Sequence, residues 1–251
     1  MGFRAAKTHG IWRIIPSPAL TEILAQSGFD FQILDCEHGG YDYATLLPDI
    51  LACERHGCAP LVRVSGTDRV EVQRCLDLGA RGLVFPQLAN YADFAAAAAM
   101  MDHAPAGTRG FNPFVRAYGY DAVAAALTRP WFVPIIETLA AVEQLDAILQ
   151  LARIDLIYIG SYDLSAQLGL TGKMDAPELL RVVDRILAAC HSVGKPVGLM
   201  ALSASAAEAF AARGVQALVH GVESHRLKQA MTGIIQEQRA LRLSPGARPL
   251  T

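Results

Sequence analysis

Eight short apolar runs recur along the 251-residue chain, and each is followed by a stretch with helical spacing. The runs are IWRII (11–15), FQIL (31–34), PLVRV (60–64), GLVFP (82–86), VPII (133–136), LIYIG (156–160), PVGLM (196–200) and ALVHG (217–221). The helix-forming stretches are 18–27, 43–56, 68–78, 91–103, 139–152, 175–193, 203–212 and 223–240. Strands that alternate with helices are typical of parallel sheets, where a crossover helix connects one strand to the next. Eight such units in about 250 residues predict an α/β fold, the (β/α)8 TIM barrel.

A doubly wound open sheet is the competing architecture. It usually has fewer strands and a glycine-rich turn after the first one, and no such turn follows residues 11–15. No linker-like composition divides the chain, so we predict a single domain over residues 1–251. The long connection 104–132 is rich in arginine and aromatic residues, and we expect it near the active-site mouth as a lid or partner contact. Residues 223–251 are expected to form a C-terminal helix and tail.

Composition excludes several classes of protein. Hydrophobic residues make up 52% of the chain and charged residues 18%, which is typical of a globular protein with a sizeable core. The net charge of −2 gives no attraction to nucleic acid or to an anionic membrane, and no apolar run is long enough to span a bilayer. Five cysteines without a CxxC pair argue against a disulfide framework or a thiolate zinc site. We therefore expect a cytoplasmic protein.

Ionisable residues gather where the predicted strands end. In a TIM barrel the loops that follow the strands converge on one face, which carries the active site. The ionisable residues at or just after the ends of strands two, three, five and six are Asp35, Glu37, His38, Arg63, Glu137 and Asp163. Their position predicts an active site on this face.

Glu137 and Asp163 follow consecutive predicted strands. Neighbouring strands are about 4.8 Å apart, so the two carboxylates could share one cation. Without a cation they would repel each other, and one would tend to take up a proton. Oxygen ligands with room for water and substrate suit Mg²⁺ or Mn²⁺ better than zinc. The alternative for each acid alone is a first-turn helix residue stabilised by the helix dipole.

Asp35, His38 and Arg63 form a second candidate group. A carboxylate bonded to one ring nitrogen of histidine would fix the tautomer and make the other nitrogen a better base. An arginine at a barrel mouth needs an anionic partner, and its fork suits a carboxylate or a developing enolate oxygen. The alternatives are a loop histidine bonded to backbone, and a salt bridge from Arg63 to Asp35 or Glu37.

Six segments, in order, resemble the HpcH/HpaI family of metal-dependent (class II) pyruvate aldolases. They are GFDFQILDCEHG, APLVRV, LDLGARGLVFPQ, AGTRGFNPFVRA, PIIET and YIGSYDLSAQLG, and the resemblance extends from about Ile11 to Glu223. It implies a (β/α)8 barrel that forms homo-oligomers, often hexamers built from dimers that exchange a C-terminal helix. It also implies reversible addition of pyruvate enolate to an aldehyde, and the reverse cleavage of a 4-hydroxy-2-oxo acid.

The resemblance also implies roles for individual residues. Glu137 and Asp163 would bind Mg²⁺, Mn²⁺ or Co²⁺, and no organic cofactor is expected. Arg63 would stabilise the enolate, and Asp35 with His38 would move the proton. The backbone N–H groups expected to hold the pyruvate carboxylate belong to Gly160, Ser161 and Tyr162. Trp12, on the first strand, is expected to wall the pocket.

A lysine-based mechanism has little support in the sequence. A Schiff base requires a buried lysine that faces the pocket. The four lysines are Lys7, Lys173, Lys195 and Lys228. Lys195 precedes a strand, at the wrong face of a barrel, and the other three lie outside the predicted strands.

Two departures from the family pattern bear on the substrate. Many relatives carry glutamine two positions before the metal-binding glutamate, where this chain has Ile135. The usual Gly-Pro before the metal loop is Gly160-Ser161 here, followed by the bulky Tyr162. A related CoA-thioester lyase remains an alternative, although no basic cluster for nucleotide phosphates is evident. A non-catalytic barrel that binds metal and a 2-oxo acid is another, with Ile135 as its first sign.

Overall fold

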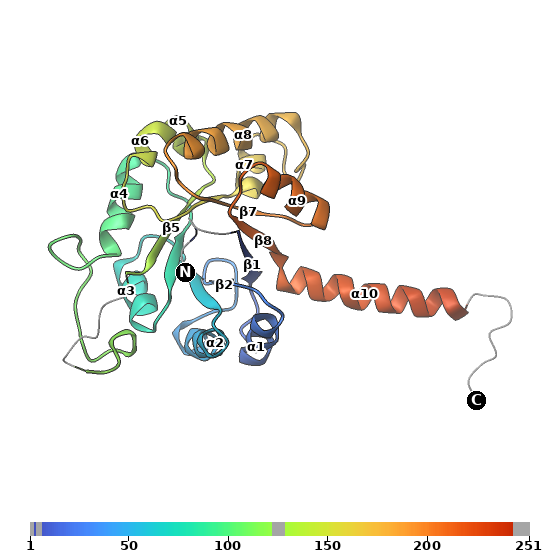
Figure 1. Ribbon diagram of the computed structural model, residues 1–251, viewed down its shortest axis with the longest axis horizontal. Coiled ribbons are helices and arrows are strands. Elements are labelled where there is room, and N and C mark those ends of the chain that lie inside the picture. Colours follow the sequence, from blue (N-terminus) through green and yellow to red (C-terminus); the bar gives the residue numbers. More distant parts are fainter. Residues whose placement is uncertain (1–2, 4–6, 122–128, 243–251) are drawn as a thin grey trace.

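The computed structural model describes residues 3, 7–121 and 129–242. Eight parallel strands form a closed barrel in chain order, with β8 paired to β1 (Figure 1). The strands are β1 Thr8–Arg13, β2 Phe31–Asp35, β3 Ala59–Arg63, β4 Gly82–Phe85, β5 Trp131–Ile136, β6 Ile157–Ile159, β7 Val197–Met200 and β8 Ala217–Val222. Closure of the sheet confirms the predicted barrel and excludes the open sheet.

Helices surround the barrel (Figure 1). They are α1 Pro18–Gln26, α2 Tyr43–Arg55, α3 Arg69–Asp77, α4 Tyr91–Met100, α5 Leu139–Glu143, α6 Leu145–Leu149, α7 Ser161–Gln167, α8 Pro177–Ser192, α9 Ala204–Ala212 and α10 Glu223–Arg242, with a 3-10 turn η1 at Arg116–Tyr118. Asp42 and Ser203 cap α2 and α9 through their side-chain oxygens, as residues of these types commonly do. No helix in the described ranges is long and apolar enough to span a membrane.

Strand register decides which side chains enter the barrel. Side chains alternate along a strand, so residues paired across neighbouring strands face the same side. Ile33 pairs with Leu61 and both belong to the apolar cluster inside the barrel, whereas Leu34 and its partner Val62 pack outward against the helices. Two residues beyond Ile33 and Leu61, Asp35 pairs with Arg63 on the inner side, at the carboxyl end of the barrel.

The predicted elements differ from the structure in two places. The expected helix over 139–152 is divided into α5 and α6, with Gln144 between them. The seven-residue helix α7 was not predicted, because its first turn coincides with the expected metal loop. Its formation places Asp163 in the first turn of a helix rather than in an irregular loop.

The described residues of the connection, 104–121 and 129–132, do not lie near the active-site mouth, so that expectation was wrong for them. Arg109 forms an ion pair with Asp77 at the end of α3, with Nη2 and Oδ1 2.8 Å apart. Arg116 donates from Nη1 to the carbonyl of Leu78 at 2.9 Å. The segment connects a helix to the following strand, β5, and such connections lie at the amino ends of barrel strands, opposite the catalytic face. Residues 122–128 of this segment lie outside the described residues.

Helix α10 projects from the barrel as an isolated arm (Figure 1). Leu227, Met231, Ile234 and Ile235 on this helix are each about half exposed, at 49–51%. Their spacing places them on one face of the helix. The predicted C-terminal helix is therefore present, whereas the predicted tail at 243–251 lies outside the described residues.

Candidate active site

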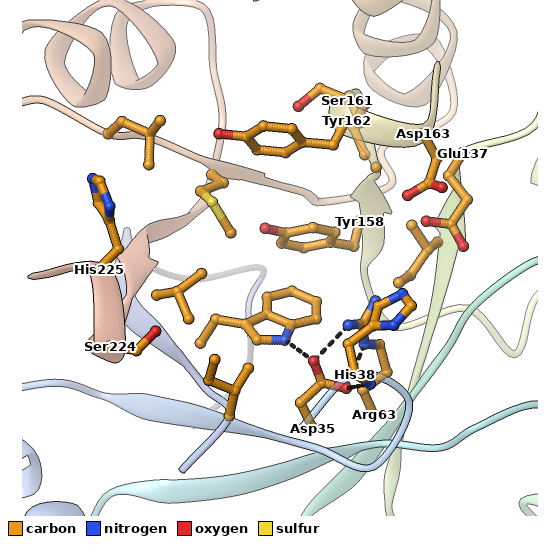
Figure 2. Close-up of a pocket in the computed structure, with 18 residues that line it drawn as sticks. Asp35, His38, Arg63, Glu137, Tyr158, Ser161, Tyr162, Asp163, Ser224 and His225 are labelled. Atoms are coloured by element: carbon orange, nitrogen blue, oxygen red, sulfur yellow. Dashed lines mark hydrogen bonds and ion pairs between the residues drawn. The ribbon is translucent and has the colours of Figure 1, made fainter. Parts of the chain in front are cut away.

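A cavity of about 480 Å³ opens at the carboxyl ends of the strands (Figure 2). Its volume is within the range of small-molecule sites. All nine residues predicted for the site from the sequence line the cavity: Asp35, His38, Arg63, Glu137, Asp163, Trp12, Gly160, Ser161 and Tyr162. The structure thus gathers the whole predicted set, although not every predicted contact within it.

Two contacts expected from the sequence are absent from this set. The ring of His38 lines the cavity without its expected bond to Asp35, and Gly160 lines it without the free N–H group expected of it.

Asp35 and Arg63 form a buried ion pair in the site. Arg63 donates from Nε to Asp35 Oδ1 at 2.9 Å and from Nη2 to Oδ2 at 2.5 Å, which is a bidentate ion pair. Trp12 donates from its indole nitrogen to Asp35 Oδ2 at 3.0 Å, and the guanidinium lies 4.8 Å from the centre of the Trp12 ring. Burial alone would raise the pKa of Asp35, but the hydrogen bonds and charge of Arg63 outweigh burial and hold this pKa below its ordinary value. Asp35 is therefore an anion that fixes Arg63.

Glu37 is a second anionic partner of Arg63. Its Oε2 lies 2.8 Å from Nη1 of the guanidinium. The sequence indicated this salt bridge only as an alternative to a role toward substrate. The structure contains this salt bridge. Nη1 and Nη2 of Arg63 each carry two N–H groups, and each uses one of them for a contact with Glu37 or Asp35.

His38 does not form the expected ring contact with Asp35, so that prediction was wrong. Asp35 Oδ1 instead accepts the backbone N–H groups of Glu37 at 2.9 Å and His38 at 3.1 Å. Together with Arg63 and Trp12, these donors occupy both oxygens of Asp35. The His38 side chain is 71% exposed, and its Nε2 lies 3.9 Å from Glu37 Oε1. Its imidazole is thus open to a ligand in the cavity.

The carboxylates of Glu137 and Asp163 lie beside each other on one side of the cavity (Figure 2). Glu137 directly follows β5, is 2% exposed, and accepts the backbone N–H of Gln87 on Oε1 at 2.6 Å. Burial raises the pKa of Glu137 to about 7, and the charge of Asp163 adds to this effect although the bond from Gln87 opposes it. The positive charge of a cation between the two carboxylates would offset both causes of the raised pKa.

The donor set fits a magnesium-like ion. No group of three or more His, Cys, Asp or Glu side chains in the described ranges is arranged to hold a metal ion. Mg²⁺ commonly binds through one or two carboxylates and completes its shell with water and substrate oxygens. Glu137 and Asp163 at a cavity wall provide this arrangement.

Gly160 is required by its close approach to Glu137. A Cβ atom at this position would lie 2.4 Å from the Cβ and 2.6 Å from the Oε2 of Glu137. The N–H of Gly160 donates to the carbonyl of Ile136 at 3.0 Å, so it is not available to a substrate carboxylate as expected from the sequence. Ser161 and Tyr162 begin α7, and the first N–H groups of a helix have no acceptor within it.

Several cavity residues were not predicted. Tyr158 pairs with Ile135 across β5 and β6, and its buried hydroxyl has no hydrogen-bond partner among the described residues. Gln87 does not line the cavity but donates its backbone N–H to Glu137, and it adopts a left-handed φ of 55°, which sequence patterns do not predict for glutamine. Ser224 and His225 enter the site from the start of α10, opposite the carboxylates (Figure 2). Their place directly after β8 was the available signal, because loops after barrel strands form the active face.

The lysines lie away from the site. All four fall within the described ranges, and none lines the cavity. Lys195 is buried and donates to the carbonyl of Leu151 at 2.7 Å, which is a structural contact. A Schiff-base mechanism therefore has no nucleophile in this cavity.

Comparison with known proteins agrees with this geometry. A family model described as HpcH/HpaI aldolase/citrate lyase matches residues 9–230. The 5-keto-4-deoxy-D-glucarate aldolase of Salmonella paratyphi A is 33% identical over 196 residues, which are 76% of this chain and 77% of that enzyme. An HpcH/HpaI aldolase/citrate lyase family protein from Burkholderia cenocepacia has a TM-score of 0.89 and 27% identity, over 94% of this chain and 97% of its own. The citrate synthase SbnG has a TM-score of 0.85 and 25% identity, over 94% of each chain.

Proposed function

Because the chain belongs to the HpcH/HpaI aldolase/citrate lyase family and is a carbon–carbon lyase, we propose that it is a divalent-metal-dependent aldolase acting on pyruvate and an aldehyde. In the reverse direction it would cleave a 4-hydroxy-2-oxo acid. The observation that carries the proposal is the carboxylate pair of buried Glu137 and half-buried Asp163, which shares one cavity with the guanidinium of Arg63.

Glu137 and Asp163 would hold the metal, with Mg²⁺, Mn²⁺ or Co²⁺ as candidates. When bound, such an ion polarises the keto group of pyruvate and stabilises negative charge on its oxygen. Two observations support the assignment. The carboxylates lie close to each other, and burial raises the pKa of Glu137 when no cation is near. Gly160 has no side chain, and this leaves the space that Glu137 occupies.

Arg63 would stabilise the enolate oxygen. Asp35 and Glu37 fix three of its nitrogen contacts, so the guanidinium is oriented before substrate binds. A donor that needs no reorganisation stabilises developing charge most effectively. Asp35 is saturated with donors, which supports a positioning role for it and not the proton-transfer role expected from the sequence.

His38 would move the proton. Its imidazole is exposed to the cavity, and imidazole can accept and return a proton near neutral pH. Removal of a proton from the pyruvate methyl group gives the enolate, whose carbon attacks the aldehyde carbonyl and forms the new carbon–carbon bond. The resulting alkoxide then takes up a proton to give the 4-hydroxy group.

The pyruvate carboxylate would be held at the start of α7. The N–H groups of Ser161 and Tyr162 lie in the first turn, beside the metal-binding Asp163. Helix amino ends attract anions because their N–H groups are free and the helix dipole is positive there. Trp12 would form the opposite wall against Arg63.

We also propose that the protein is a homo-oligomer that uses α10. The exposed apolar face of this helix, made of Leu227, Met231, Ile234 and Ile235, extends away from the barrel of its own chain (Figure 1). A contiguous apolar face of this kind commonly marks a protein interface. The hexamer implied by the family resemblance is the expected assembly.

Exchange of the pyruvate methyl protons for deuterium tests the proposed function. The protein is mixed with pyruvate and Mn²⁺ in D₂O, and loss of the methyl signal is followed by NMR after the metal is removed. We expect exchange that EDTA abolishes. No exchange with any divalent ion would favour the non-catalytic barrel that only binds metal and a 2-oxo acid. Exchange without cleavage of any free 4-hydroxy-2-oxo acid would favour the CoA-thioester lyase.

A further inference from the structure

The cavity has two halves of different chemistry. The half formed by β2, β3, β5 and the start of α7 carries the charged side chains, including Arg63, Glu137 and Asp163. The half formed by β1, β7, β8 and the residues that follow them is mainly apolar. Its side chains are Trp12, Ile14, Met200, Leu202 and Val222.

The apolar half is large enough to hold a substrate group of its own. The whole cavity measures about 480 Å³, whereas pyruvate has only three carbons and would lie between the carboxylate pair and Arg63. The new carbon–carbon bond forms at the pyruvate methyl carbon, so the acceptor must extend from there into the remaining space. The apolar half is that space.

Charge limits what the acceptor can carry. Arg63 is the only lysine or arginine among the described residues that line the cavity, and both of its terminal nitrogens already contact carboxylates. The cavity also holds the three carboxylates Asp35, Glu137 and Asp163, so a bound divalent ion would bring the formal charge to zero. Pyruvate then adds one negative charge. A second carboxylate in the apolar half would be desolvated without a cationic partner, which is strongly unfavourable.

Polar groups near this half are few. Ser224 and His225 lie at the start of α10, and the phenol rings of Tyr158 and Tyr162 point toward this half from the side of β6 and α7 (Figure 2). Ile135 occupies a pocket-facing position on β5. A polyhydroxylated acceptor would therefore leave most of its hydroxyl groups facing apolar side chains, without the hydrogen bonds they lose from water.

We propose that the apolar half selects an aldehyde with an uncharged, apolar substituent, aliphatic or aromatic. The inference rests on the proposed aldolase function and adds the class of acceptor. It separates this enzyme from one built for a sugar diacid, the class of compound named for the Salmonella relative. Leu202, 40% exposed at the outer edge of this half, is the specificity-determining position that is most open to substitution.

The test compares cleavage rates for a series of 4-hydroxy-2-oxo acids. Tails from methyl to pentyl, a phenyl tail, and 5-keto-4-deoxy-D-glucarate are each supplied with Mn²⁺, and pyruvate release is coupled to lactate dehydrogenase. We expect kcat/KM to rise about fourfold for each added methylene until the apolar half is filled, which is the factor expected for burying one CH₂ group. The diacid should be the poorest substrate of the series.

A charge-introducing variant makes the test specific. Leu202→Arg places a cation in the apolar half and should lower kcat/KM for the alkyl series while raising it for the diacid. Val193→Arg is the matched control, because Val193 is 42% exposed, close to the value for Leu202, and does not line the cavity. It should leave the order of substrates unchanged.

The outcomes distinguish this inference from the proposed function. Deuterium exchange into pyruvate together with a preference of the wild-type enzyme for the diacid would overturn the apolar acceptor and leave the aldolase standing. An unchanged order of substrates in Leu202→Arg would also overturn it. Absence of both exchange and cleavage with every divalent ion would overturn the two proposals together.

Discussion

Arg63 contributes both to the stability of the site and to its chemistry. It forms ion pairs with Asp35 and Glu37, so replacing it with alanine would leave two carboxylates near each other without their cationic partner. Breaking a buried ion pair in this way costs about 3–5 kcal/mol of folding free energy. Loss of activity in that variant would therefore mix unfolding with a missing catalytic group.

Arg63→Lys separates the two roles. Lysine keeps the positive charge but cannot form the bidentate contact to Asp35 or hold a second donor on the enolate oxygen. We expect kcat to fall about 10²–10³-fold, the loss typical of one oxyanion donor, with metal affinity unchanged. Steady-state kinetics and a Mn²⁺ titration measure the two quantities. A wild-type rate would remove Arg63 from enolate stabilisation.

Glu137 makes the stability of the metal-free protein depend on pH. Its pKa rises from 4.5 to about 7 on folding, so between these values the folded state binds more protons than the unfolded state. The contribution of Glu137 to the free energy of unfolding is therefore fully present below pH 4.5 and is lost as the pH rises through 7. The loss from this residue is of the order of 3 kcal/mol, since each pKa unit corresponds to about 1.4 kcal/mol.

Urea unfolding in EDTA at pH 6 and pH 8 measures this dependence. The wild type should lose more stability over this range than Glu137→Gln, which has no titrating group at this position. Saturating Mn²⁺ should restore the wild type at pH 8 but not the variant, because Glu137 is proposed as a ligand. Equal pH dependence in the two proteins would show that Glu137 titrates normally.

Tyr158 has a buried hydroxyl that finds no hydrogen-bond partner within the part of the chain that the structure describes. Removing such a group eliminates a desolvation cost of about 1–3 kcal/mol without breaking a hydrogen bond. Tyr158→Phe should therefore be as stable as the wild type or more stable in the absence of ligands. Thermal unfolding measures this, with Tyr41→Phe as the control that does lose bonds, to the carbonyl of Ile15 and to Asp49. A clear destabilisation by Tyr158→Phe would reveal a partner for this hydroxyl.

At the level of elements, the metal site depends on how closely β5 and the β6–α7 turn approach each other. Only glycine fits at position 160, since any Cβ there would overlap Glu137. Gly160→Ala should displace Glu137 and weaken Mn²⁺ binding about 10–100-fold, as changes to groups that position a metal ligand typically do. Gly66→Ala is the matched control, because a Cβ at Gly66 meets no atom within 4 Å. Equal metal affinity in both variants would contradict the proposed constraint.

The sequence was sufficient to predict the eight strands and most of the helices because the same strand–helix pattern repeats eight times. The strands carry apolar residues on both faces, with Ile33 facing the barrel interior and Val62 facing the helices. Such strands are typical of a parallel sheet that is buried on both sides. The predicted site residues also proved to share a cavity, since position at a strand end already fixes the face of the barrel.

Contacts within the site could not be predicted from position alone. Asp35 lies within reach of both His38 and Arg63, and the choice between them depends on the register that pairs Asp35 with Arg63. The prediction that residues 104–132 lie near the active-site mouth was wrong for a different reason. Their order in the chain, after α4 and before β5, already places them at the amino ends of the strands. Their length and composition outweighed that information in the prediction.

For the whole molecule, α10 is the element that the barrel of its own chain leaves uncovered (Figure 1). Four apolar side chains on one helix face, each about half exposed, are unfavourable in water, and a partner surface would remove that cost. Burial of one isoleucine side chain contributes about 1.5–3 kcal/mol. An assembly that depends on this face should therefore be sensitive to two charges placed on it.

The double variant Ile234→Asp/Ile235→Asp tests whether this face holds the oligomer together. Each subunit would contribute two carboxylates in place of two buried isoleucines, so we expect the assembly to dissociate into smaller species that remain folded. Light scattering after size-exclusion chromatography, over a range of protein concentrations, measures the mass. Gln236→Asp is the control, because Gln236 is exposed on the same helix but outside the apolar face. If the double variant keeps the wild-type mass at every concentration, α10 does not mediate the assembly, and the exposed face must have another partner.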